Sequence, residues 1–155
     1  MQIIYHCAFN FPAVLITFGP SFWDRLKKVY FRMVTDKDSR VKKSLASSLS
    51  EIANILGPSI TESELIPVLD RLSKEDGEIQ NTLLKTLPKF LRNLNKPLRR
   101  GYLERLRRLL NPREKWRTRM EYAIIIGEYH GVFDDEITYK QIFPIALNFC
   151  FDDVK

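Results

Sequence analysis

Glycine and cysteine are scarce in this sequence, with six glycines and two cysteines among 155 residues. Because glycine marks many turns, long stretches without it favour helices over strands. Cys7 and Cys150 lie near opposite ends and show no spacing typical of a disulfide framework or a zinc site. Unpaired thiols are typical of reducing compartments, so we expect a cytoplasmic protein, with the nucleus as the alternative location.

The sequence also lacks a long uninterrupted apolar run. Nothing approaches the roughly 20 apolar residues that a transmembrane helix needs, so we expect no membrane partner. The segment 3–19, IIYHCAFNFPAVLITFG, is apolar, but His6, Asn10 and Pro12 interrupt it. It has no basic segment before it and no small-residue cleavage site after it, so it does not fit a secretory signal peptide.

The residue patterns of an active site are missing as well. The two histidines, His6 and His130, lie far apart, and we expect no metal site. No Ser-His-Asp or Cys-His arrangement can be assembled, and no glycine-rich phosphate loop is present. We interpret Asp134, Asp135 and Glu136 as acids at the start of a helix, where they complement the helix dipole. The sequence therefore predicts a protein that is not an enzyme, with no catalytic residue and no cofactor.

What the sequence does contain is a pattern that recurs about every 38 residues. Apolar residues make up 45% of the chain, which is enough for a continuous core. Self-similarity at this period is typical of helical repeat proteins. The recurring residues are Gly19-Pro20 and Gly57-Pro58 at a spacing of 38, Pro12 and Pro88 at 76, and Pro67 and Pro144 at 77.

Each repeat is predicted to form two amphipathic helices, because its apolar residues recur at helical spacing. We expect a helix end at Gly57 and a capping box at Thr61–Glu64. Another helix is expected to start with Asn111 as its cap and Glu114 in its first turn. The predicted apolar stripes are Phe22, Leu26, Val29, Tyr30 and Met33; Val41, Leu45, Leu49, Ile52 and Leu56; Leu65, Val68, Leu69 and Leu72; Ile79, Leu83, Leu87, Phe90 and Leu94; and Leu98, Tyr102, Leu106 and Leu109.

These helix pairs predict an all-α fold, an α-solenoid of helical hairpins that stack side by side. A single pair cannot bury its stripe alone, so neighbouring pairs stabilise one another. We expect the right-handed superhelical stack of a fragment from a longer array. The predicted units are 1–19 (partial), 20–57, 58–95, 96–131 and 132–155 (partial).

The segment 36–58, DKDSRVKKSLASSLSEIANILGP, resembles a HEAT repeat. Together with KWRTRMEYAIIIGEY and PIALNFCFDDV, it resembles the HEAT scaffold and regulatory subunits of type 2A-like serine/threonine phosphatases. Within that group the resemblance is to protein phosphatase 4 regulatory subunits, regulatory subunit 4 in particular. The resemblance implies a non-catalytic scaffold whose partners are a phosphatase catalytic subunit and acidic protein substrates.

A strongly basic segment at 99–119 suggests where a partner binds. The segment contains nine basic residues and only two acids, Glu104 and Glu114. Such a segment can be a solvated helix face, a dock for an acidic protein or a nucleic-acid groove. The third interpretation underlies our alternative function, an adaptor for nucleic acid or nuclear transport. The basic residues are Arg99, Arg100, Arg105, Arg107, Arg108, Arg113, Lys115, Arg117 and Arg119.

Within this segment, the resemblance implies that Lys115, Trp116 and Arg117 contact the catalytic subunit from a turn between two helices. A rigid indole beside planar guanidinium groups suits a protein interface, and we add Arg113 and Arg119 to the predicted partner-binding site. One alternative is that Trp116 points inward, because it continues the 37- to 38-residue spacing of two apolar stripe residues, Val41 and Ile79. Another is a mixed role, in which the indole is half packed and half exposed.

Overall fold

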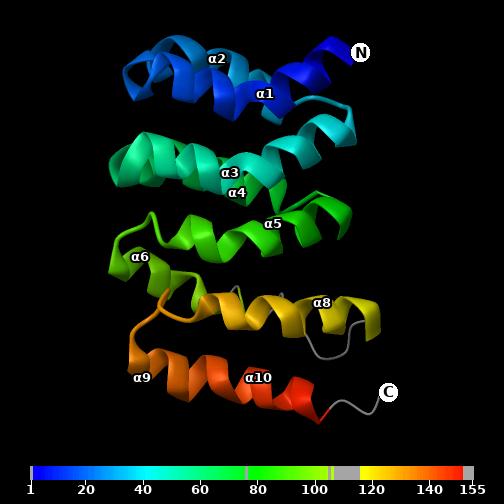
Figure 1. Ribbon diagram of the computed structural model, residues 1–155, viewed down its shortest axis with the longest axis vertical. Helices are drawn as coiled ribbons and strands as arrows, with labels where there is room; N and C mark the ends of the chain where they lie inside the picture. The colour runs from blue at the N-terminus through cyan, green and yellow to red at the C-terminus, as the bar shows by residue number, and fades with distance from the viewer. Residues whose placement is uncertain (1, 76, 105, 107–115, 152–155) are drawn as a thin grey trace. The chain divides into compact units, whose positions relative to one another are not determined.

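The computed structural model describes residues 2–75, 77–104, 106 and 116–151 (Figure 1). All regular elements among these residues are helices, and no strand occurs in them. The chain divides into two compact units, Met1–Leu94 and Asn95–Lys155. The predicted all-helical fold class is confirmed.

In the first unit the helices form two layers (Figure 1). Helix α3 packs between α1 and α5 in one layer, while α2 contacts α4 in the other. Short loops connect consecutive helices, so chain neighbours are also neighbours in space. The bounds are α1 Gln2–Phe18, η1 Pro20–Phe22, α2 Trp23–Val34, α3 Ser39–Ile60, η2 Thr61–Leu65, α4 Ile66–Leu72 and α5 Gly77–Leu91.

Glycines mark two of the boundaries between helix pairs. Gly19 has φ 80° and ψ 166°, and Gly57 has φ 78° and ψ 174°. This region is essentially restricted to glycine, because a Cβ would clash with the backbone. The break predicted at Gly57 is confirmed, although its ψ lies far from the left-handed helical value of the glycines that commonly end helices. Asn95, one spacing later, caps α6 with φ −66° and therefore needs no glycine.

Two matching π-helical turns precede the prolines that lie 77 residues apart. The Ile66 N–H donates to the Thr61 carbonyl, and the Phe143 N–H donates to the Thr138 carbonyl, each across five residues. Proline has no N–H to donate and its ring crowds the carbonyl four residues earlier. The widened turn before Pro67 and before Pro144 accommodates both effects.

The predicted capping box at 61–64 is wrong. The helical turns already begin at Pro58, directly after Gly57, so Thr61 lies inside them. Its hydroxyl is buried and donates to the Ala53 carbonyl at 3.2 Å. Glu64 instead accepts hydrogen bonds from Trp23 and Lys27 of α2.

The apolar stripe of α2 is also shifted from the predicted one. Phe22 precedes the helix and is exposed, as is Val29, whereas Trp23 is buried. The Trp23 ring packs against Tyr30 and Phe11, with ring centroids 5.5 and 6.5 Å apart. The large indole sets the helix phase because its burial removes more apolar surface from water than that of Phe22 would. The three stripes predicted for α3, α4 and α5 are buried as expected: Val41, Leu45, Leu49, Ile52 and Leu56; Leu65, Val68, Leu69 and Leu72; and Ile79, Leu83, Leu87, Phe90 and Leu94.

The second unit contains shorter described helices. Leu98 is exposed, contrary to the predicted stripe, while Leu103 and Leu106 are buried. Leu109 and the predicted helix start at 111–114 lie outside the described residues. The helix start predicted at the acidic run is confirmed, with Asp134 as the cap. The bounds are α6 Lys96–Gly101, α8 Trp116–Ile126, η3 Gly127–Tyr129, α9 Asp135–Ile137, η4 Thr138–Ile142 and α10 Phe143–Cys150.

Among the described helices, none is by itself both long and apolar enough to cross a membrane. The segments Ile3–Phe18 and Pro20–Val34 meet those criteria only as a pair, and they are bent by 115°.

Candidate partner-binding surface

Trp116 begins helix α8 and is half exposed. Its exposed fraction is 49%, whereas Val41 and Ile79, the residues whose spacing it continues, are each 1% exposed. The interpretation of Trp116 as a fully inward residue is therefore wrong, and its exposure agrees with the mixed role. A half-exposed indole offers a large rigid surface to a partner, which is typical of interface residues.

The structure tests the rest of this predicted site only in part. Arg119 is half-buried on the same helix. Arg117 belongs to α8, but its side chain lies outside the described residues, as do Arg113 and Lys115. The geometry of the five residues as a cluster therefore stays a prediction.

Two described turns in the first unit join the helices of a pair, which is the position that the resemblance predicts for the partner-binding site. Thr35 ends α2 and its hydroxyl donates to the Arg32 carbonyl at 2.9 Å. Ser73 ends α4 and its hydroxyl donates to the Asp70 carbonyl at 2.9 Å. These two side chains stand 38 residues apart, and each hydroxyl donates to a carbonyl in the last turn of its own helix, where the usual intrahelical hydrogen bonds run out. The two turns therefore end their helices in the same way.

Polar contacts connect the second turn to the helices around it. Lys42 of α3 pairs with Glu75 at 2.6 Å, and both side chains are largely buried. The Gln80 amide donates to the carbonyls of Ser73 and Glu75 at 3.1 Å each. The turn is thereby fastened to the starts of α3 and α5, which gives a partner a preorganised surface.

The first turn is organised by acids. The Asp36 carboxylate accepts from the Asp38 N–H at 2.8 Å, and Asp38 caps α3 by accepting from the Arg40 N–H at 2.9 Å. Hydrogen bonds from the Arg40 guanidinium lower the pKa of Asp38 below its usual value. The turn thus keeps a carboxylate charge at the N-terminus of α3, where the helix dipole favours it.

A groove of about 750 Å³ lies between the C-terminal part of α2 and the length of α4, and it reaches the turns at Thr35 and at Lys74 and Glu75. Phe31, Val34 and Val68 give it apolar walls. Its charged lining residues are of both signs: Asp70, Arg71, Lys74 and Glu75. Apolar walls with a charged margin are typical of protein interfaces.

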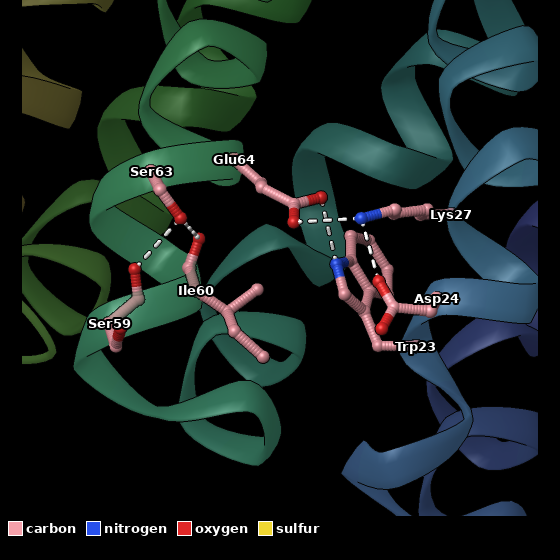
Figure 2. A network of polar contacts seen from close by, with 7 residues as sticks. All are labelled: Trp23, Asp24, Lys27, Ser59, Ile60, Ser63 and Glu64. Atoms are coloured by element: carbon pink, nitrogen blue, oxygen red, sulfur yellow. Dashed lines mark hydrogen bonds and ion pairs between the residues drawn. The ribbon is translucent and has the colours of Figure 1, made fainter.

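The network in Figure 2 ties α2 to the π-helical turn of the next helix pair. The buried indole N–H of Trp23 donates to Glu64 Oε2 at 3.0 Å, and Lys27 Nζ lies 3.1 Å from Glu64 Oε1. Lys27 also pairs with Asp24 at 2.7 Å. Its hydrogen bond to Asp24, and to a smaller extent its hydrogen bond to Glu64, raises the pKa of Lys27. This network was missed in the sequence analysis. One signal was available: Trp23 stands four residues after Gly19, and the buried Thr61 stands four residues after Gly57, so the repeat predicts an inward position for Trp23 as well.

Part of the basic segment has a structural role. Arg100 pairs with Asp134 at 2.5 Å, Lys96 lies 3.7 Å from the same carboxylate, and Arg99 donates to the Val132 carbonyl at 3.2 Å. The neighbouring guanidinium of Arg100 lowers the pKa of Asp134. These contacts hold α6 against the turn before α9. The side chains of Arg99 and Arg100 therefore already bind groups within the protein, which leaves them less available to a partner.

Within the described part of the chain, no group of three or more His, Cys, Asp or Glu side chains could hold a metal ion. Cys7 and Cys150 are free and exposed.

Comparison with known proteins identifies the family. Residues 7–109 match the family model of the protein phosphatase 4 regulatory subunit 1 middle domain. The chain is 35% identical over 158 residues to serine/threonine-protein phosphatase 4 regulatory subunit 1 of Homo sapiens, and equally to that of Mus musculus and of Rattus norvegicus. Each alignment covers 99% of this chain and 16% of the relative, so the chain spans about a sixth of the relatives' length.

These matches confirm the resemblance to protein phosphatase 4 regulatory subunits and correct its detail. The relatives are regulatory subunit 1, whereas we expected regulatory subunit 4. The matches lend no support to an adaptor for nucleic acid or nuclear transport. The chain belongs to the family of the protein phosphatase 4 regulatory subunit 1 middle domain.

Proposed function

We propose that this chain is part of a non-catalytic regulatory subunit that binds a protein phosphatase 4-type catalytic subunit and positions its protein substrates, acidic ones among them. The observation that carries the proposal is the 35% identity to regulatory subunit 1 over 99% of this chain. A scaffold of this kind acts through placement alone, because holding two reactants in the right geometry lowers the entropic cost of their encounter.

The proposal includes the architecture. We propose that the helix pairs are HEAT-type hairpins that continue as a right-handed α-solenoid in the longer protein. The two-layer packing of the first unit supports this, as do the glycine breaks at 19 and 57 and the matching π-helical turns. Small-angle X-ray scattering of the longer protein tests it, because a solenoid is markedly more elongated than a globule of equal mass.

We further propose that the catalytic subunit docks on the turns between paired helices, with Trp116 and its basic neighbours at 113–119 as the central contact. The half-exposed indole and the fastened turn at Ser73–Glu75 support this location. A large aromatic side chain at the centre of an interface commonly contributes about 2 kcal/mol or more to binding.

A binding assay tests the site. Trp116→Ala is compared with Ile124→Ala, which removes another exposed apolar side chain from the same helix α8. With purified catalytic subunit, Trp116→Ala is expected to weaken binding about 30-fold, the equivalent of about 2 kcal/mol, while Ile124→Ala leaves it unchanged. If the Trp116→Ala variant binds as tightly as wild type, the proposed site is contradicted but the proposed function is not. A wild-type chain that does not bind would contradict the function.

We propose the cytoplasm as the working location, with the nucleus as the alternative. The two free, exposed cysteines suit a reducing compartment. Fluorescence microscopy of the tagged protein tests this, and an exclusively secretory distribution would contradict it.

A further inference from the structure

A second groove, of about 570 Å³, crosses the layer formed by α1, α3 and α5. We name it the serine groove, after Ser44, Ser47 and Ser48 of α3, which line it. It uses different residues from the groove beside the turns, which is formed by α2 and α4.

The serine groove exists because α3 carries small side chains between two closely packed neighbours. Thr86 of α5 reaches the Ala46 carbonyl at 3.2 Å, so α5 approaches the α3 backbone closely. On the other side α1 contributes the aromatic rings of Tyr5 and Phe9. Serines on α3 cannot fill the space below those rings, and the surface is therefore hollow there.

The aromatic wall is unusual for a surface. Phe9 is 64% exposed, and the whole of α1, Gln2–Phe18, contains no charged side chain. Tyr5 and Phe9 stand one helical turn apart, so they present one continuous apolar face. Exposed apolar surface of this kind, beside polar groups, commonly marks a binding site.

The two ends of the serine groove carry opposite charges. Arg40 and Lys43 line one end of the α3 stretch and Glu51 lines the other. Lys43 pairs with Glu78 at 2.8 Å, but both side chains are exposed, and such pairs contribute little and exchange readily. Arg40 is likewise exposed, although it pairs with Asp38 at 2.8 Å. A ligand carboxylate can therefore share both cations at modest cost.

The distance between these ends sets the size of the ligand. From residue 40 to residue 51 the helix rises about 16 Å, at roughly 1.5 Å per residue. An extended peptide covers that length with about five residues, at roughly 3.3 Å each.

We propose that the serine groove binds a short extended segment of a partner protein, about five residues long. The segment carries a carboxylate at the end beside Arg40 and Lys43, and a basic side chain at the end beside Glu51. Its central aromatic or large aliphatic side chain packs on Phe9. The hydroxyls of Ser44 and Ser47 accept from and donate to the peptide backbone. The charge pattern and the exposed ring together favour this occupant over an apolar helix, which would leave Glu51 and the cations without ligand partners.

A positional-scanning library of extended pentapeptides with a central phenylalanine tests the proposal, with fluorescence polarisation and the purified chain. We expect selection of Asp or Glu at one terminal position and of Lys or Arg at the other. Glu51→Lys is expected to reverse the preference at the basic position. A change of selectivity, unlike a loss of binding, does not follow from misfolding.

Ser47→Trp fills the exposed middle of the serine groove and is expected to weaken the selected peptide at least tenfold. Ser21→Trp is the matched control, because Ser21 is an exposed serine of the same unit outside the groove. Equal binding by Ser47→Trp and wild type, or a library that selects no such charge pattern, would overturn the proposal. No phosphatase is present in this assay, so its failure is distinct from failure of the proposed function.

Discussion

Glu64 holds the buried indole of Trp23, and its replacement gives a sharp test of the packing between α2 and the following helix pair. Trp23 is 2% exposed, so its N–H cannot exchange Glu64 for water without opening the structure. A hydrogen bond to a charged group contributes about 1.5–3 kcal/mol, and a buried donor left alone costs a similar amount. We expect Glu64→Leu to lower the free energy of unfolding by about 2 kcal/mol. We assign none of this to Lys27, because its pair with Glu64 is partly exposed and such pairs contribute little to stability.

The assay is urea unfolding followed by circular dichroism at 222 nm. Trp23→Phe supplies the second side of a double-mutant cycle, because it keeps a ring in the core and removes the donor. In that background Glu64→Leu should cost much less, with a coupling energy of about 1–2 kcal/mol. Glu64→Gln keeps an acceptor and should cost less than Glu64→Leu. Additive effects of Trp23→Phe and Glu64→Leu would refute the reasoning, because they would show that the hydrogen bond contributes nothing to stability.

Two further substitutions test the backbone and the core. Gly57→Ala should lower the free energy of unfolding by about 1–3 kcal/mol because φ is 78° there. The control Gly77→Ala, at the start of α5 and free of positive φ, should be neutral or stabilising in the same urea titration. Burial raises the pKa of Tyr30, whose hydroxyl has no partner among the described residues. The unfolded chain therefore loses this proton first, and the unfolding free energy should fall as the pH rises above about 10. Tyr30→Phe should remove this part of the alkaline loss and leave stability at pH 7 equal or higher, which unfolding at pH 7 and pH 11 would check; a lower stability at pH 7 would contradict the reasoning.

The buried face of a helix was predicted best where apolar residues recur at helical spacing without interruption. The stripes of α3, α4 and α5 were predicted because each carries an apolar residue at nearly every inward position. For α2 the period admitted two phases, one with Phe22 inward and one with Trp23. The choice depended on a contact with Phe11 in another helix, which local periodicity cannot report.

A local motif gave a wrong prediction where its side chains instead make tertiary contacts. Thr61 and Glu64 have the spacing of a capping box, yet Thr61 turns to the Ala53 carbonyl and Glu64 turns to Trp23, 41 residues away. Such partners are chosen by the packing of whole helices. For the predicted partner-binding site, spacing alone placed Trp116 inward, whereas the structure leaves it half exposed.

The two tryptophans of the chain fall one in each compact unit, Trp23 in an apolar surrounding and Trp116 half in solvent. Each half of the protein therefore contains its own intrinsic chromophore. Emission maxima from single-indole versions would show whether the halves melt in one cooperative step or in succession. The placement makes the thermodynamic independence of neighbouring segments measurable without any added label.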